Sequence, residues 1–256
     1  ISTCYPSAAR DVIIGDMSDT PPTDPLAILA EAPLFNGLDE QARQSALQVA
    51  YRRFIRSGEY FFFQDDPATT FYVLLEGRAR LIQLTPEGQQ VVVRYVGPGD
   101  GIGIIVVLSE MDYPLSAEAL TDCEALAWDA AGVTNLMQGY PSLALNGMRL
   151  VARRFRSLQH RYRELATEKV ERRVARALLR LARQAGRRTE RGVLIDLPLS
   201  RQDLGEMTGT TLYTVSRLLS RWEQAGLVET GREQVIIRNP HGLVVIAEDL
   251  PLEDHS

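Results

Sequence analysis

The chain has 256 residues, of which 45% are hydrophobic and 24% are charged, enough to build two ordinary globular domains. No apolar run approaches the ~20 residues of a membrane span, and two cysteines are too few for a disulfide framework or a four-cysteine zinc or iron–sulfur site. The net charge of −5 is unevenly divided, because residues 1–148 hold 8 basic and 19 acidic side chains while residues 149–256 hold 20 and 14. We therefore expect a cytoplasmic protein that does not bind a membrane. Only its second half has the net positive charge that favours binding to nucleic acid.

Residues 1–25 contain the stretch SDTPPTDP, which is typical of a flexible arm or a non-native extension. Short helices are expected next, the second of them after residues 36–37. Over residues 53–128, short apolar stretches alternate with turn signals at roughly ten-residue spacing, the pattern of an antiparallel β-barrel or β-sandwich. Within it, residues 81–93 predict a hairpin. We assign residues 26–142 to this β-domain.

The stretch GDGIG at residues 99–103 has three glycines in five positions, as in a loop that lets a phosphate approach the backbone. An apolar run begins at Ile104, however, and no Arg or Lys lies between Arg94 and Arg149. A buried phosphate without a cationic partner bears an uncompensated desolvation cost. The loop therefore has the shape of a phosphate site and not its chemistry, since Arg78, Arg80 and Arg94 lie on other predicted strands and are expected in solvent. The candidate effector-pocket residues are Gly99, Gly103, Ile104, Leu115 and Ser116.

After Pro141 the hydrophobic period becomes helical. Apolar side chains recur at alternating intervals of four and three residues from Ala144 to Leu165, in a narrow stripe flanked by arginines. Such a seam is typical of a two-stranded coiled coil, whereas a helix packed on its own domain usually shows a wider stripe. We therefore expect residues 143–167 to form the dimerisation helix of a homodimer. Its predicted contact residues are Met148, Val151, Phe155, Leu158, Tyr162 and Leu165.

A second helix, ending near Gly186, is expected to precede the most informative stretch, LSRQDLGEMTGTTLYTVSRLLSRWEQAGLVETGREQVIIRNP. Ser200, followed by Asp203, predicts the start of one helix, and Thr211 can cap the next. In that next helix Val215, Leu218, Leu219 and Trp222 are expected to point inward. A hairpin signal follows Gly226. Helix, tight turn, helix and hairpin predict a winged helix–turn–helix over residues 168–242, with a tail over residues 243–256.

A β-roll, a long dimerisation helix and a winged helix–turn–helix in this order resemble the Crp/Fnr family of bacterial transcription regulators. The motifs LSRQDLGEMTG and TVSRLLSRWEQAGLV carry the resemblance, which covers about residues 26–240, and GDGIG is similar to the glycine loop of the family. The resemblance implies an α+β fold with an N-terminal, cyclic-nucleotide-binding-like sensor domain. It also implies a homodimeric transcription activator that binds inverted-repeat half-sites on double-stranded DNA and contacts RNA polymerase. The residues form no catalytic constellation, so we expect no enzyme.

By the pattern of the family, Arg201 and Thr211 should touch backbone phosphates, while Tyr213, Ser216 and Arg217 should face base edges. Many relatives have Glu at the position of Tyr213, so the half-site is expected to differ there, whereas Arg217 can read guanine through two hydrogen bonds. Phosphate attraction is further expected from the arginines of the preceding helix. These are Arg172, Arg173, Arg176 and Arg180.

Members that bind cyclic nucleotides carry Glu and Arg at the positions of Ile104 and Leu115, so cyclic AMP is not expected as the effector. The stretches YPLSAEAL and GTTLYTVSR resemble a subgroup associated with denitrification and nitric oxide, in which some members are held to use haem. Residues 1–159 contain no histidine, and Cys123 is more typical of a core residue than of a haem ligand. Three alternatives stay open: haem or nitric oxide, an unidentified apolar effector, and action without a ligand. We expect neither an iron–sulfur cluster nor another metal site.

Overall fold

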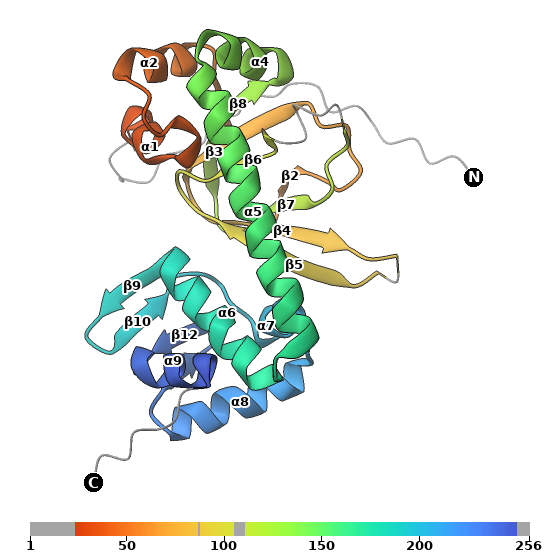
Figure 1. Cartoon of the computed structure of the whole chain (residues 1–256), viewed down its shortest axis with the longest axis vertical. Helices are drawn as coiled ribbons and strands as arrows, with labels where there is room; N and C mark the ends of the chain where they lie inside the picture. The colour runs from red at the N-terminus through yellow and green to blue at the C-terminus, as the bar shows by residue number, and fades with distance from the viewer. Residues whose placement is uncertain (1–23, 87, 105–110, 250–256) are drawn as a thin grey trace.

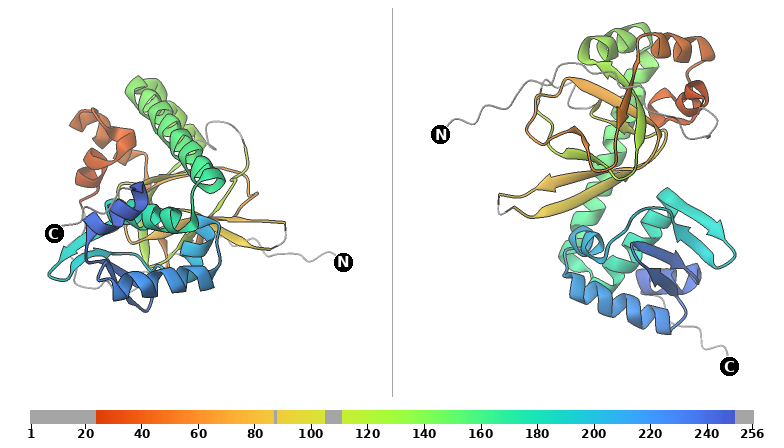
Figure 2. Two further views of the ribbon diagram at one scale, coloured as in Figure 1. Left: turned by 60° about the horizontal axis from the view of Figure 1, so that its bottom comes forward. Right: turned by 180° about the vertical axis from the view of Figure 1, so that it is seen from behind.

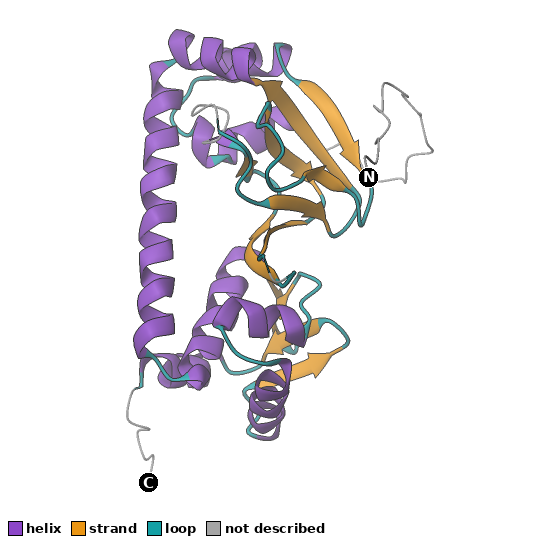
Figure 3. Cartoon of the chain, turned by 90° about the vertical axis from the view of Figure 1, so that its right-hand side faces the viewer, coloured by secondary structure: helices purple, strands orange, loops and turns teal. Residues whose placement is uncertain are grey.

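The computed structural model describes residues 24–86, 88–104 and 111–249 (Figure 1). A β-domain preceded by short helices forms one end of the molecule, a helical domain with a small sheet forms the other, and one long helix joins them (Figures 1 and 3). Nowhere in these three ranges is a helix both long and apolar enough to cross a membrane.

Short helices cover one end of the β-domain (Figure 1). The helices α1, α2 and α4 each begin at an aspartate whose carboxylate accepts a hydrogen bond from a first-turn N–H, the ordinary way to satisfy these donors. They pack around Trp128, whose indole Nε1 donates to the carbonyl of Ala46 at 2.8 Å. The elements are α1 (Pro25–Glu31), η1 (Pro33–Phe35), α2 (Glu40–Gln48) and α4 (Ala130–Gly139).

Two four-stranded antiparallel sheets form the β-domain, in the orders β1-β8-β3-β6 and β2-β7-β4-β5. The expected hairpin is β4 and β5, which projects from the roll (Figure 2). This arrangement confirms the predicted β-roll. The strands are β1 (Tyr51–Ile55), β2 (Tyr60–Phe62), β3 (Thr70–Glu76), β4 (Ala79–Leu84), β5 (Gln90–Val96), β6 (Gly101–Ile102), β7 (Ser116–Ala119) and β8 (Cys123–Asp129).

The long helix α5 (Pro141–Thr167) begins two residues before the expected start at residue 143. Proline suits a first helical position, because its fixed φ is helical and its missing N–H would have no partner there. After α5 the chain is extended at Glu168 and Lys169, and α6 (Val170–Ala185) follows, as expected. A Cβ at Gly186 would lie 2.1 Å from the carbonyl of Ala182, so only glycine fits at this exit.

The C-terminal domain contains the predicted helix–turn–helix and hairpin, and two features that the sequence did not predict. One is a second hairpin, β9 with β10, which extends the small sheet to the order β11-β12-β10-β9; β9 reads GRRT and lacks the apolar alternation of a strand signal. The bounds are β9 (Gly186–Thr189), β10 (Gly192–Ile195), α7 (Arg201–Thr208), α8 (Leu212–Gln224), β11 (Val228–Gly231), β12 (Gln234–Ile237) and α9 (Pro240–Glu248).

The other feature is α9, which corrects the expected tail over residues 243–256. Residues 243–248 are helical, and Leu243 and Ala247 are buried in the same core as α6. The side chain of Asn239 caps this helix by accepting from the N–H of Gly242. Five consecutive apolar or small residues at 243–247 give no helical period of their own, so the helix depends on the partner surface of α6.

Candidate DNA-binding surface and effector pocket

The turn between α7 and α8 is tight because two glycines allow it. Gly209 ends α7 in the left-handed conformation, with φ of 60°, and a Cβ at Gly205 would lie 2.9 Å from the carbonyl of Thr210. At the other end, Ser200 and Asp203 form the predicted capping box, with each side chain bonded to the backbone N–H of the other. These two glycines and the capping box therefore fix where α7 begins and how sharply the chain turns into α8.

Helix α8 buries one side and exposes the other. Thr211 caps it, accepting from the N–H of Thr214 at 3.2 Å. Tyr213 is 80% exposed, Arg217 is exposed and Ser216 is half-buried. The inward residues are those expected from the sequence, Val215, Leu218, Leu219 and Trp222.

The remaining predicted DNA contact lies on the same surface. Arg201 is the first residue of α7 and is exposed, as is Thr211 at the start of α8. Beyond α8 the hairpin of β11 and β12 turns at Arg232 and Glu233, the latter with φ of 55°. The domain thus presents two helix N-termini and a hairpin tip, the parts with which winged helix–turn–helix domains meet the grooves and backbone of DNA.

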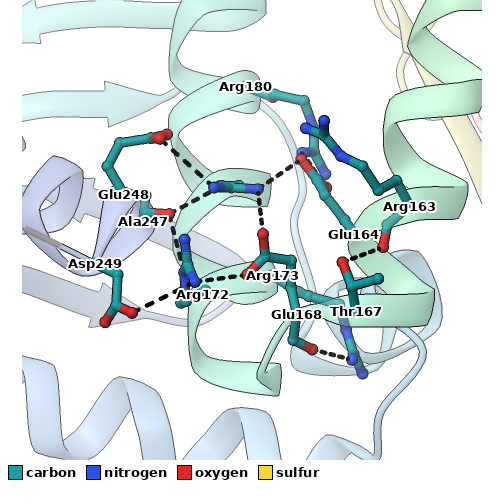
Figure 4. Close-up of polar contacts among 11 residues, drawn as sticks. Arg163, Glu164, Thr167, Glu168, Arg172, Arg173, Arg180, Ala247, Glu248 and Asp249 are labelled. Atoms are coloured by element: carbon teal, nitrogen blue, oxygen red, sulfur yellow. Dashed lines mark hydrogen bonds and ion pairs between the residues drawn. The ribbon is translucent and has the colours of Figure 1, made fainter.

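The four arginines of α6 that were expected to attract phosphate are each engaged within the protein (Figure 4). Arg180 pairs with Glu164 at 2.8 Å and Arg172 pairs with Glu168 at 2.8 Å. Arg176 lies 3.3 Å from Glu168, and Arg173 donates to the carbonyl of Thr208 at 2.9 Å. Through Glu164 and Glu168 these contacts tie α6 to the end of α5 and to the residue that follows it. Through Arg173 they also tie α6 to the end of α7.

The candidate effector pocket is divided between the two sheets. Gly99 and Gly103 have φ of 81° and 86° beside β6, and a Cβ at Gly103 would lie 2.8 Å from the carbonyl of Thr70. Ile104 is 1% exposed and Leu115 is half-buried. Most of the apolar run that follows Ile104 lies in residues 105–110, outside the described residues.

Ser116, at the start of β7, already has a partner within the chain: its Oγ accepts from the N–H of Gln64 at 2.8 Å. Tyr113, three residues earlier, stacks on Phe62 with 3.6 Å between ring centroids. Its hydroxyl donates to the carbonyl of Thr70 at 2.7 Å and accepts from the N–H of the same residue. Aromatic side chains and internal hydrogen bonds therefore occupy this part of the roll.

The expectation that Arg78, Arg80 and Arg94 of the β-domain lie in solvent is wrong, because each has a partner within the protein. Arg80 is not solvated: its guanidinium pairs with Glu118 at 2.8 Å and with Asp203 of α7 at 3.0 Å, and its side chain is 20% exposed. Arg94 pairs with Asp100 at 3.5 Å. Arg78 is also partnered, 3.7 Å from Asp196. The pairs of Arg78 and Arg80 join chain segments that only the tertiary fold brings together, whereas Asp100 lies six residues after Arg94.

Arg154 is one of the arginines that flank the predicted seam of α5. Its Nη2 donates to the carbonyl of Gly101 in β6 at 2.9 Å, and its Nε is buried without a hydrogen-bond partner among the described residues. The spacing of Arg154 from the seam shows only that it faces away from a coiled-coil partner. Contact with the glycine loop follows from how α5 crosses the roll.

Neither Cys123 nor the described histidines support a haem site. Cys123 is buried, its thiol donates to the carbonyls of Arg78 and Thr121, and burial raises the thiol pKa to about 11, so it is no thiolate. His160 and His241 are exposed and lie on α5 and α9. Among the described residues, no three His, Cys, Asp or Glu side chains are grouped to hold a metal ion.

Helix α5 runs along one side of the molecule (Figure 3), and its predicted seam is exposed. All six of its residues are exposed, from Val151 at 40% to Tyr162 at 75%. Leu165 also lies at the helix–turn–helix, since a Cβ at Gly209 would be 2.8 Å from its Cδ2. A continuous apolar stripe of this kind on one helix marks an interaction surface.

A sensor-type β-roll, a helix with an open seam and a winged helix–turn–helix define a DNA-binding transcription regulator, and the comparisons with known proteins agree. Residues 172–246 match the Crp-like helix-turn-helix domain, and residues 52–140 match the cyclic nucleotide-binding domain. The chain belongs to the Crp/Fnr family of transcription regulators.

Three relatives show how far the similarity extends. The Cyclic AMP receptor protein of Thermus thermophilus is 32% identical over 84% of this chain and 97% of its own length. The Transcriptional activator protein anr of Pseudomonas aeruginosa is 27% identical over 91% of each chain. The structure of FixK2 from Bradyrhizobium japonicum matches with a TM-score of 0.69 and 27% identity, over 77% of this chain and 97% of that one. These relatives are regulators and not enzymes.

Proposed function

We propose that this regulator acts as a homodimer on inverted-repeat half-sites, with α8 in the major groove and with RNA polymerase as a further partner. The observation that carries the DNA assignment is the two-sided burial of α8. Val215 and Leu219 are buried, while Tyr213 and Arg217 project into solvent near the N-terminus of the helix, where recognition helices contact base edges. The similarity to the Transcriptional activator protein anr of Pseudomonas aeruginosa supports a role in transcription activation.

Within this surface the contacts divide into two kinds. Arg217 has the forked donors that bind guanine, and Tyr213, without a carboxylate, cannot accept from cytosine as a glutamate would. Arg201 and Thr211 lie at the helix N-termini, where side chains and backbone N–H groups bind phosphate. The buried side chains of α8 hold these exposed side chains in place.

The dimer follows from the seam on α5. A two-fold pairing of two α5 helices would bury Phe155, Leu158 and their neighbours, and it would place two α8 helices on half-sites about one helical turn apart, ~34 Å. Members of the family bind DNA as dimers, which agrees with this arrangement.

We further propose that the effector is not cyclic AMP. Ile104 and Leu115 replace the charged residues of nucleotide-binding members, and the Ser116 hydroxyl is already bonded to Gln64. Haem, as a route to nitric oxide sensing, gains no support from Cys123 or the described histidines. The alternatives to haem are an unidentified apolar small-molecule effector and DNA binding without a ligand.

DNA binding with substituted α8 tests the proposal. Arg217→Ala should weaken specific DNA by ~1–3 kcal/mol and leave random DNA nearly unchanged, because one base contact is lost per half-site. Arg201→Ala should instead weaken both DNAs and lower the salt dependence by about one unit per phosphate contact, about two per dimer. Arg53→Ala, at an exposed position on β1 of the β-domain, serves as the control. An equal loss on specific and random DNA with Arg217→Ala would overturn the base-reading assignment.

A further inference from the structure

One guanidinium group, that of Arg176 in α6, joins three separate parts of the chain. Toward α5 it lies 3.7 Å from Glu164, and it lies 3.3 Å from Glu168, the first residue after that helix. Toward α9 its Nε donates to the carbonyl of Ala247 at 2.9 Å, and its Nη2 lies 3.5 Å from Glu248. The side chain of Arg176 is 14% exposed, so solvent screens these contacts only in part.

The same groups are also held by the arginines one turn before and one turn after Arg176 on α6. Arg180 pairs with Glu164 at 2.8 Å, and Arg172 pairs with Glu168 at 2.8 Å. The Nε of Arg172 also donates to the carbonyl of Ala247 at 3.4 Å. Residues four positions apart lie on one side of a helix. A row of three arginines on α6 therefore connects the end of α5 to the C-terminal end of α9 (Figure 4).

The connection between α5 and α6 is two residues of extended chain. These are Glu168 and Lys169, and Lys169 is exposed and gives α6 no side-chain cap. The seam on α5 sets the two-fold axis of the proposed dimer, whereas α8 shares a core with α6 through side chains such as Leu178 and Leu219. The angle between α5 and α6 therefore decides how far each α8 lies from the axis. The two-fold symmetry applies any change of that angle to both half-sites.

We propose that Arg176, held between Glu168 and the C-terminal end of α9, is a positioning residue that sets the half-site spacing the dimer accepts. Four partners on both sides of the guanidinium fix its place, so α6 meets α5 at one angle. Removing one member of a partly buried ion pair is costly, because the remaining charge is left unmatched. The role needs no contact between Arg176 and DNA. This inference rests on the proposed function, because spacing has meaning only for a dimer that binds two half-sites.

The test uses the inverted repeat that the unsubstituted full chain selects from random DNA, and copies of it with one base pair inserted or removed between the half-sites. The unsubstituted protein should prefer the selected spacing, and Arg176→Met should weaken that preference by about tenfold. Glu168→Gln should also weaken it, because it removes the charge of one partner and keeps its shape. Arg183→Met, in the last turn of the same helix, removes an equal charge from an exposed side chain and should keep the preference.

The salt dependence of binding separates a positioning residue from a phosphate contact. Arg176→Met should keep the slope of log affinity against log salt concentration, whereas a lost phosphate contact would lower it by about one unit per contact. A lowered slope would overturn the positioning role. So would an unchanged spacing preference in Arg176→Met or, if that variant does not fold, in Glu168→Gln. Failure of the unsubstituted chain to select any inverted repeat would overturn the proposed function itself, and this inference with it.

Discussion

Arg80 of the β-roll and Asp203 of α7 are joined by an ion pair of 3.0 Å across the domain boundary. Asp203 is also the capping-box residue of the first DNA-binding helix, and Arg80 is held from its other side by Glu118 of β7. Glu118 stands two residues after Ser116 in the same strand. One chain of charged contacts therefore runs from the pocket strand of the sensor to the start of the helix–turn–helix.

Arg80→Met should lower the free energy of unfolding by about 3 kcal/mol, because it leaves two partly buried carboxylates without their cation. Urea unfolding followed by fluorescence measures the change. Arg52→Met is the matched control: it breaks an exposed pair with Glu124 in the same domain, and exposed pairs contribute about 0–1 kcal/mol. If both variants lowered the free energy of unfolding by the same small amount, the ion pair between Arg80 and Asp203 would not stabilise the fold.

Phe155→Asp combined with Leu158→Asp should convert the dimer to monomers, because two charges per chain would enter the apolar seam. Light scattering during size-exclusion chromatography gives the mass directly. Ser157→Asp with His160→Asp places the same charges on the other faces of α5 and should leave a dimer. A dimeric mass for the seam variant would show that another surface holds the subunits together.

Cyclic AMP should leave the thermal unfolding midpoint unchanged. A ligand stabilises the folded state in proportion to the logarithm of its concentration above Kd, so even weak binding appears as a concentration-dependent rise. Differential scanning fluorimetry with cyclic AMP, against sodium chloride of the same ionic strength, makes the measurement. A rise that grows with cyclic AMP would contradict the roles given to Ile104 and Leu115.

Leu243→Ala should destabilise the DNA-binding domain by ~2–5 kcal/mol, as expected for the truncation of a fully buried leucine. Thermal or urea unfolding detects a change of this size. Val244→Ala, at the neighbouring position where the side chain is 36% exposed, should cost clearly less. Equal small effects would mean that α9 is not part of the core.

The sequence by itself determined the order of the elements and the faces of the helices. Ser200, Gly209 and the inward residues of α8 carry local signals, because capping, left-handed turns and helical period depend on neighbours along the chain. The 4-3 spacing likewise predicted the exposed stripe on α5. Positions without such a local signal were missed, as in the GRRT strand of β9 and the unpatterned apolar run of α9.

Only the tertiary structure decided what the arginines do. Arg172 and Arg176 face carboxylates on the preceding helix end, Arg80 reaches Asp203, and Arg154 reaches Gly101. None of these partners is visible in the sequence, since long flexible side chains have no period that reveals what they contact. An ion pair depends on two segments meeting in space, 123 positions apart for Arg80 and Asp203. The packing of the whole chain decides which distant segments meet. The charged contacts at the pocket and at the domain boundary could therefore not be predicted from the sequence.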